Sequence, residues 1–115
     1  MANEREKRVA FVNDSLREAY NKLKDGKFED KELYGFVSRA IDDLKKNPLC
    51  GDRVPNKQIP KEYLKRFGVN SVWKYNLPNA WRLIYTVVGD EVKIVSMILE
   101  WMSHKDYNRR FRYNK

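Results

Sequence analysis

Three strand-like runs, separated by short turn signals, occupy residues 72–101 and constrain the fold more than any other feature. They are VWKYNL (72–77), WRLIYTVV (81–88) and VKIVSMILEW (92–101). The first two alternate between two faces, whereas the third is apolar on both faces, which is typical of a central strand. Gly89-Asp90 marks a hairpin between the second and third runs. These runs together predict a small antiparallel sheet.

The clearest helix is predicted over residues 30–46, because its apolar residues form one continuous stripe. The stripe consists of Leu33, Phe36, Val37, Ala40, Ile41 and Leu44. Asp30 is suited to cap the start of this helix, and Pro48 is suited to follow its end. A helix with a single apolar stripe packs that stripe on a core.

The residues before this helix predict a strand followed by another helix. RVAFV (8–12) is suited to a short strand, although Val9, Val12 and Leu16 also keep a helical spacing. Ser15 and Glu18 have the spacing of a capping box at a helix start. We therefore favour a strand and then a helix.

A third, shorter helix is predicted in IPKEYLKRFG, with Pro60 in its first turn and Gly68 past its end. The elements together predict a single α+β domain over residues 1–115. In this arrangement an N-terminal strand and a helical hairpin pack on one face of a small antiparallel sheet.

The positive charge lies in the second part of the chain. Residues 1–47 carry 11 Lys and Arg against 10 Asp and Glu, whereas residues 48–115 carry 13 against 6. Such a skew favours a polyanionic partner, most often a nucleic acid, and the interleaved aromatic residues suit contact with bases. Solubility alone is the simpler alternative.

Composition also argues against several classes of protein. A single cysteine, Cys50, excludes an intramolecular disulfide, and one cysteine with one histidine cannot form a structural Cys/His metal site. We expect neither a metal nor a cofactor. The charged first residues and the lack of a long apolar run predict no signal peptide and no membrane span. A cytoplasmic protein with a reduced thiol is expected.

Lys74 and Arg82 are predicted to leave the sheet on the face opposite the helices. The guanidinium of Arg82 is suited to clamp a phosphate, because it presents a rigid fork of donors and stays charged. Lys74 has the same functional interpretation. The alternative for Arg82 is an edge-strand position paired with Glu91 or Glu100.

The segment after the third run adds further candidate residues. His104 is the only histidine, and histidine is the residue type best suited to move protons at neutral pH, although a lone histidine is often structural. Tyr107 can stack on a base or pack in the core. A basic rim for the RNA backbone is assigned to Lys61, Lys65, Arg66, Arg109, Arg110 and Arg112. Cleavage by a 2′-hydroxyl needs a base, an acid and stabilisation of charge on the phosphate, all of which these residue types can supply without a metal.

The stretches AWRLIYTVVGDEVKIV and HKDY, within a similarity over residues 8–113, resemble the RelE/ParE superfamily of toxins from type II toxin-antitoxin systems. RelE-type members are ribosome-dependent endoribonucleases that cut messenger RNA, and ParE-type members share the fold but poison DNA gyrase. By position, Lys74 matches a basic residue of the sheet, Arg82 matches the arginine at the scissile phosphate, and Tyr107 matches a tyrosine that stacks on the cleaved nucleotide.

Two positions depart from the RelE pattern. Asn76 replaces a second sheet lysine, and the arginine expected after the last strand falls near Trp101 or Met102, neither of which is basic. His104 could substitute for that arginine. The resemblance therefore implies a mRNA interferase that inhibits translation, with the ribosome, messenger RNA and an acidic, wrapping antitoxin as partners. The alternative is a non-catalytic relative that inhibits gyrase or only binds RNA or an antitoxin.

Overall fold

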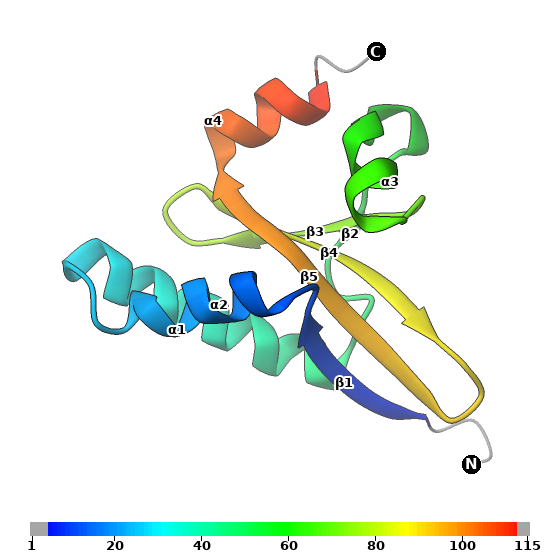
Figure 1. Cartoon of the computed structure of the whole chain (residues 1–115), viewed down its shortest axis with the longest axis horizontal. Helices are drawn as coiled ribbons and strands as arrows, with labels where there is room; N and C mark the ends of the chain where they lie inside the picture. The colour runs from blue at the N-terminus through cyan, green and yellow to red at the C-terminus, as the bar shows by residue number, and fades with distance from the viewer. Residues whose placement is uncertain (1–4, 113–115) are drawn as a thin grey trace.

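The computed structural model describes residues 5–112 and shows an α+β fold. Its elements are β1 (Glu6–Phe11), α1 (Asp14–Leu23), α2 (Phe28–Lys46), β2 (Asp52–Arg53), α3 (Lys61–Phe67), β3 (Trp73–Leu77), β4 (Trp81–Gly89), β5 (Lys93–Ser103) and α4 (His104–Tyr107), with a 3-10 turn at Asn56–Gln58 and a π-helix at Asn108–Arg112. Within the described residues the strands form one sheet in the order β1-β5-β4-β3-β2 (Figure 1). The α+β class and the predicted order of elements are confirmed.

The sheet is mixed, so the prediction of an antiparallel sheet is wrong for one strand. β1 pairs with β5 in parallel, from Glu6 opposite Lys93 to Phe11 opposite Ile98, whereas the other pairs are antiparallel. Parallel neighbours need a long connection, and all the remaining elements of the sheet and the helical hairpin lie between these two strands in the sequence. The apolar pattern of a strand contains no information on its direction.

α1 and α2 cover one face of the sheet. The stripe of α2 is buried there against Leu83, Tyr85 and Ile98 of β4 and β5. Trp73, Tyr75 and Leu77 of β3 point to the same face, which confirms the predicted alternation. The cluster on this face is the larger of the two core clusters, and Figure 1 shows α1 and α2 on this side of the sheet.

The opposite face, on which Lys74 and Arg82 are predicted to lie, is also covered, so the prediction that helices pack on one face of the sheet is incomplete. Tyr63 of α3 and Phe111 of the π-helix pack edge to face over it, with ring centroids 5.4 Å apart. They bury a second cluster that includes Ile84, Leu99 and Met102. Because these sheet residues are apolar, α3 and the C-terminal helices remove them from water. Side chains at the end of this face, where α4 begins, stay accessible.

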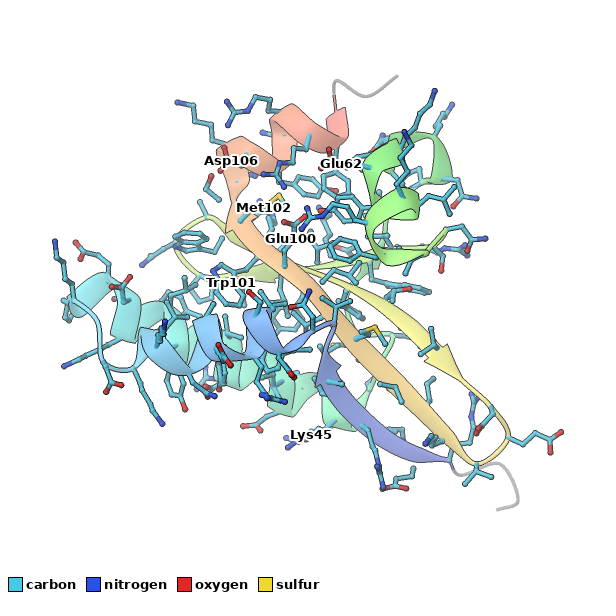
Figure 2. The ribbon with its side chains drawn as sticks, in the orientation of Figure 1. Lys45, Glu62, Glu100, Trp101, Met102 and Asp106 are labelled. Atoms are coloured by element: carbon cyan, nitrogen blue, oxygen red, sulfur yellow. The ribbon has the colours of Figure 1, made fainter. Side chains whose placement is uncertain are left out.

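A β-bulge in β5 shapes this second face. Ile84 lies opposite Glu100, but the next residue, Tyr85, lies opposite Ile98, so Leu99 is the extra residue. Leu99 and Glu100 consequently both contact the second cluster, in which Glu100 accepts a hydrogen bond from Tyr63. Figure 2 shows Glu100 on the side of α3 and α4 and Trp101 on the side of α1.

None of the helices within residues 5–112 is both long and apolar enough to cross a membrane.

Candidate functional site

Arg82 lies in the middle of the sheet, between Asn76 of β3 and Met102 of β5. It therefore does not occupy an edge strand, and its guanidinium contacts neither acid proposed as its partner. Its Nη1 donates to the carbonyl oxygen of Trp81 at 3.0 Å, and its Nη2 lies 2.7 Å from His104 Nδ1. Its Nε is buried and has no hydrogen-bond partner within the described part of the chain. Because this atom is buried, it can donate to an anion only when the guanidinium turns out of this position.

His104 is the first residue of α4 and is exposed. A guanidinium nitrogen can only donate, so His104 Nδ1 is the acceptor in the contact with Arg82. In a neutral imidazole the ring hydrogen then resides on Nε2, which lies 3.0 Å from the side-chain amide of Asn108. Half a turn of that amide presents its oxygen to Nε2 as the acceptor. Arg82 and Asn108 together fix the orientation of the imidazole.

The backbone at the start of α4 is joined to the turn between β3 and β4. His104 N donates to the carbonyl oxygen of Ala80 at 2.6 Å. Ala80 and Asn79 both have positive φ, of 62° and 59°, and such a conformation is unfavourable for a residue with a Cβ. Ser103 Oγ caps α4 by accepting from Asp106 N at 3.1 Å. The position of the imidazole is thereby fixed by backbone contacts on both sides.

Lys74 reaches this end of the sheet from β3, and its Nζ lies 5.3 Å from the centroid of the Tyr107 ring. Tyr107 is only 6% exposed and stacks on Phe111 with centroids 4.4 Å apart. One face of the tyrosine ring therefore meets the ammonium group and the other meets a phenylalanine. In this arrangement Tyr107 holds Lys74 in place, and stacking on a nucleotide would require one of these neighbours to move.

The structure thus joins the four predicted residues as two pairs, Arg82 with His104 and Lys74 with Tyr107, and α4 provides one member of each pair. Alternation along the strands predicts that Lys74 and Arg82 share a face. Of the two residues near which the resemblance expects a further arginine, Trp101 and Met102, Met102 is 5% exposed and lies directly opposite Arg82.

The predicted basic rim divides into two groups. Arg109 is paired with Asp106, and Arg110 lies 3.3 Å from both carboxylate oxygens of Glu100. Their charges are therefore partly neutralised. Lys61, Lys65 and Arg66 of α3 are exposed, and none of them forms an ion pair within residues 5–112. The side chain of Arg112 lies outside the described residues.

A polar network behind the site is absent from the sequence-based prediction. Tyr63 donates to Glu100, and Arg110 contacts the same carboxylate. Burial is the largest cause of the raised pKa of Tyr63, and the hydrogen bond to Glu100 adds to it. A glutamate within the apolar run of β5 is the one signal in the sequence that could have indicated this network.

No group of three or more His, Cys, Asp and Glu side chains within residues 5–112 is arranged to hold a metal ion.

Comparison with known proteins adds no identity to this description: the chain matches no family model, no curated protein and no solved structure.

Proposed function

We propose that this protein is a RelE-like toxin, a metal-independent endoribonuclease that cuts messenger RNA on the ribosome and so inhibits translation. The observation that carries the proposal is the contact between Arg82 and His104, together with the contact of Lys74 with Tyr107 in the same helix as His104. A phosphate-binding group, a proton-transfer group and a second cation therefore lie at one accessible end of the sheet. These are the groups that cleavage by a neighbouring 2′-hydroxyl requires.

In this proposal, binding of a phosphate removes the hydrogen bond that His104 accepts from Arg82. Without RNA, Arg82 Nη2 donates to Nδ1 of the imidazole and occupies its lone pair. A phosphate oxygen competes for the same guanidinium, whose Nε already lacks a partner. When Arg82 turns to the phosphate, Nδ1 becomes free to accept a proton.

The reaction then proceeds by proton transfer and phosphoryl transfer. Nδ1 of His104 removes the proton of the 2′-hydroxyl, and that oxygen attacks the adjacent phosphorus. The bond from phosphorus to the 5′-oxygen breaks, and the ammonium group of Lys74 donates a proton to the departing oxygen. The products are a 2′,3′-cyclic phosphate and a 5′-hydroxyl. Arg82 stabilises the charge that develops on the phosphoryl oxygens.

Growth and RNA measurements on variants test this proposal. Induced expression of the unaltered chain should arrest growth and produce messenger RNA with new 5′-hydroxyl ends inside codons. Arg82→Ala and His104→Ala should remove both effects, because they delete the phosphate clamp and the base. Arg39→Ala, on the exposed side of α2, is the matched control and should remain toxic. A folded Arg82→Ala protein that still arrests growth and cleaves RNA would contradict the proposal.

A second candidate function is favoured by the lack of a basic residue at Trp101 and Met102, near which the resemblance expects an arginine. A protein of this kind would bind RNA, or inhibit gyrase, without cutting. Growth arrest with DNA damage signalling and no new RNA ends would favour gyrase inhibition. Binding to RNA without arrest would favour a non-catalytic role. In either case, we propose an acidic antitoxin as the partner that covers the basic face.

A further inference from the structure

Asn76 lies beside the reacting groups and has no role in the reaction described above. It is directly opposite Arg82 in the pairing of β3 with β4, and it follows Lys74 by two residues in β3. Alternation along β3 directs Asn76 and Lys74 to one face of the sheet, because Tyr75 and Leu77 pack on the other. Asn76 therefore leaves the sheet on the same face as Arg82.

The side chains of Asn76 and Arg82 belong to the closer of the two kinds of opposite pair in an antiparallel sheet. Val54 N donates to the carbonyl oxygen of Val72, so the backbone of Val72 faces away from β4. This direction repeats every second residue, so the backbone of Asn76 also faces away from β4 and the pair is not hydrogen-bonded. The Cβ atoms of such a pair are roughly 4.5–5.5 Å apart. Both side chains can therefore contact one nucleotide.

The amide of Asn76 is exposed and forms no hydrogen bond with any group in residues 5–112. It presents a donor and an acceptor side by side. Adenine matches this pattern with its N7 acceptor and its N6 amino donor, whereas guanine has two acceptors, N7 and O6, on the corresponding edge. Adenine repeats the pattern at N1 and N6, so an unstacked adenine offers two edges to such an amide.

The arrangement of the strands indicates which nucleotide Asn76 contacts. In the proposed reaction His104 takes the proton of the 2′-hydroxyl, and Lys74 protonates the departing 5′-oxygen. His104 reaches Arg82 from the side of β5, because α4 follows β5. Asn76 and Lys74 belong to β3, on the opposite side of β4. Asn76 is therefore on the side of the nucleotide that carries the 5′-oxygen.

We propose that Asn76 selects adenine as the base on the 3′ side of the cut, by donating to its N7 and accepting from its N6 amino group. This selection rests on the proposed function, because Arg82 must hold the scissile phosphate. Asn76 takes no part in proton transfer and determines specificity alone. The RelE pattern has a lysine here, and lysine cannot accept a hydrogen bond, so the resemblance does not imply a preference for adenine.

Cleavage of ribosome-bound messages that differ only in the base after the cut tests this selection. The unaltered chain should cut before adenine with a kcat/KM at least about tenfold above that for the other bases. Asn76→Leu should still cut but lose the preference. Asn76→Lys should prefer guanine, because lysine donates to N7 and O6 but cannot accept from N6 of adenine. Asn21→Lys, on the exposed side of α1, adds the same charge as a matched control and should keep the preference for adenine.

A binding experiment separates this selection from the proposed reaction. 2′-O-methyl oligonucleotides lack the attacking hydroxyl, so their binding to the full chain can be followed by fluorescence anisotropy without cleavage. Oligomers of adenine should bind the unaltered chain more tightly than oligomers of cytosine or uracil, and Asn76→Leu should remove the difference.

Equal cleavage before all four bases would overturn the selection of adenine. So would a folded Asn76→Leu protein that keeps the preference of the unaltered chain in either measurement, or a chain that binds none of the oligonucleotides. A preference for adenine in binding that depends on Asn76, without any cleavage, would contradict the proposed reaction alone.

Discussion

Three tyrosine hydroxyls each join the sheet or α3 to another element. Tyr63 donates to Glu100 and Tyr75 donates to Asp43 of α2. Tyr85 donates to the carbonyl oxygen of Pro48 at 2.9 Å and accepts from Gly51 N at 3.0 Å. The loop that follows α2 is therefore fixed to β4 through a single phenol.

These phenols make the stability of the protein sensitive to alkaline pH. Burial raises the pKa of Tyr75 to about 12, helped by its bond to Asp43, and burial likewise raises the pKa of Tyr85 to about 12. The ordinary value is 10.0. The folded state therefore retains these protons when the unfolded state loses them, so the contribution is complete below pH 10 and is lost as pH rises toward 12.

We predict that the free energy of unfolding falls between pH 10 and 12, and that this fall is shallower in the double variant Tyr75→Phe with Tyr85→Phe. Urea denaturation at several pH values in this range measures both slopes. Equal slopes in the variant and the unaltered chain would show that the two phenols ionise alike in the folded and unfolded states.

The sequence predicts the positions of side chains on the strands better than those of side chains in the C-terminal helix α4. Alternation is enough to place Lys74 and Arg82 on one face, because strand geometry is regular. It could not reveal that Arg82 Nη2 contacts His104, or that Tyr107 is buried against Phe111. Those contacts depend on the direction in which α4 leaves β5, which is set by the bond from His104 N to Ala80 O.

At the scale of elements, the start of α1 differs from the capping box predicted from Ser15 and Glu18. Asn13 is the N-cap, and its Oδ1 accepts from Leu16 N at 2.9 Å. Both residue types are good caps, so the choice depends on where β1 ends and not on propensity. At the start of α2, Asp30 is inside the helix and accepts from Lys27 N at 3.1 Å.

Asn13→Ala should therefore lower the free energy of unfolding by about 1 kcal/mol. Ser15→Ala, the matched control two residues later, should change it by less than about 0.5 kcal/mol, because its hydroxyl does not cap the helix. Urea denaturation of both variants measures the difference. A larger loss of stability in Ser15→Ala than in Asn13→Ala would show that Ser15 caps the helix, as the capping-box spacing predicts.

Two glycines in helical elements should respond to alanine in opposite directions. Gly68 ends α3 with φ of 69°, which is unfavourable for any residue with a Cβ, so Gly68→Ala should destabilise the protein by about 1–2 kcal/mol. Gly35→Ala, in the interior of α2, should stabilise it by up to about 1 kcal/mol. Neither Cβ would meet another atom within 4 Å. Thermal and urea denaturation of both variants check the two signs, and a loss of stability in Gly35→Ala would contradict the open space above it.

The helices and strands themselves could largely be predicted from the sequence, because their apolar periods are long and regular. α3 occurs where Pro60 and Gly68 predict it. The sequence did not reveal that Tyr63 and Phe111 cover the second sheet face. Such a contact joins two short helices far apart in the chain, and neither helix is long enough for its period to show which side it buries.

For the molecule as a whole, the distribution of charge indicates where RNA would bind. Lys61, Lys65 and Arg66 extend from α3 without acidic partners among the described residues, whereas Arg109 and Arg110 are paired. A cation that is already paired releases fewer counterions when a phosphate binds.

Replacement of Lys61, Lys65 and Arg66 by Ala should therefore reduce the salt dependence of binding to single-stranded RNA. The slope of log K against log salt concentration should become smaller in magnitude by roughly 2. A triple variant with the same loss of charge on the other side, Lys22→Ala with Lys24→Ala and Lys45→Ala, is the matched control and should keep the slope. Filter binding over a range of salt concentrations measures the slopes of both triple variants. A slope for the α3 variant identical to that of the unaltered chain would show that these three residues do not contact the RNA backbone.

The parallel pairing of β1 with β5 determines the order in which this sheet can be completed during synthesis. Glu6 must wait for its neighbour Lys93, which a ribosome adds only after the helical hairpin and the intervening strands. A nascent chain interrupted before β5 therefore has neither a complete sheet nor the segment that contains His104. Any activity that depends on His104 can begin only after β5 and α4 have been synthesised.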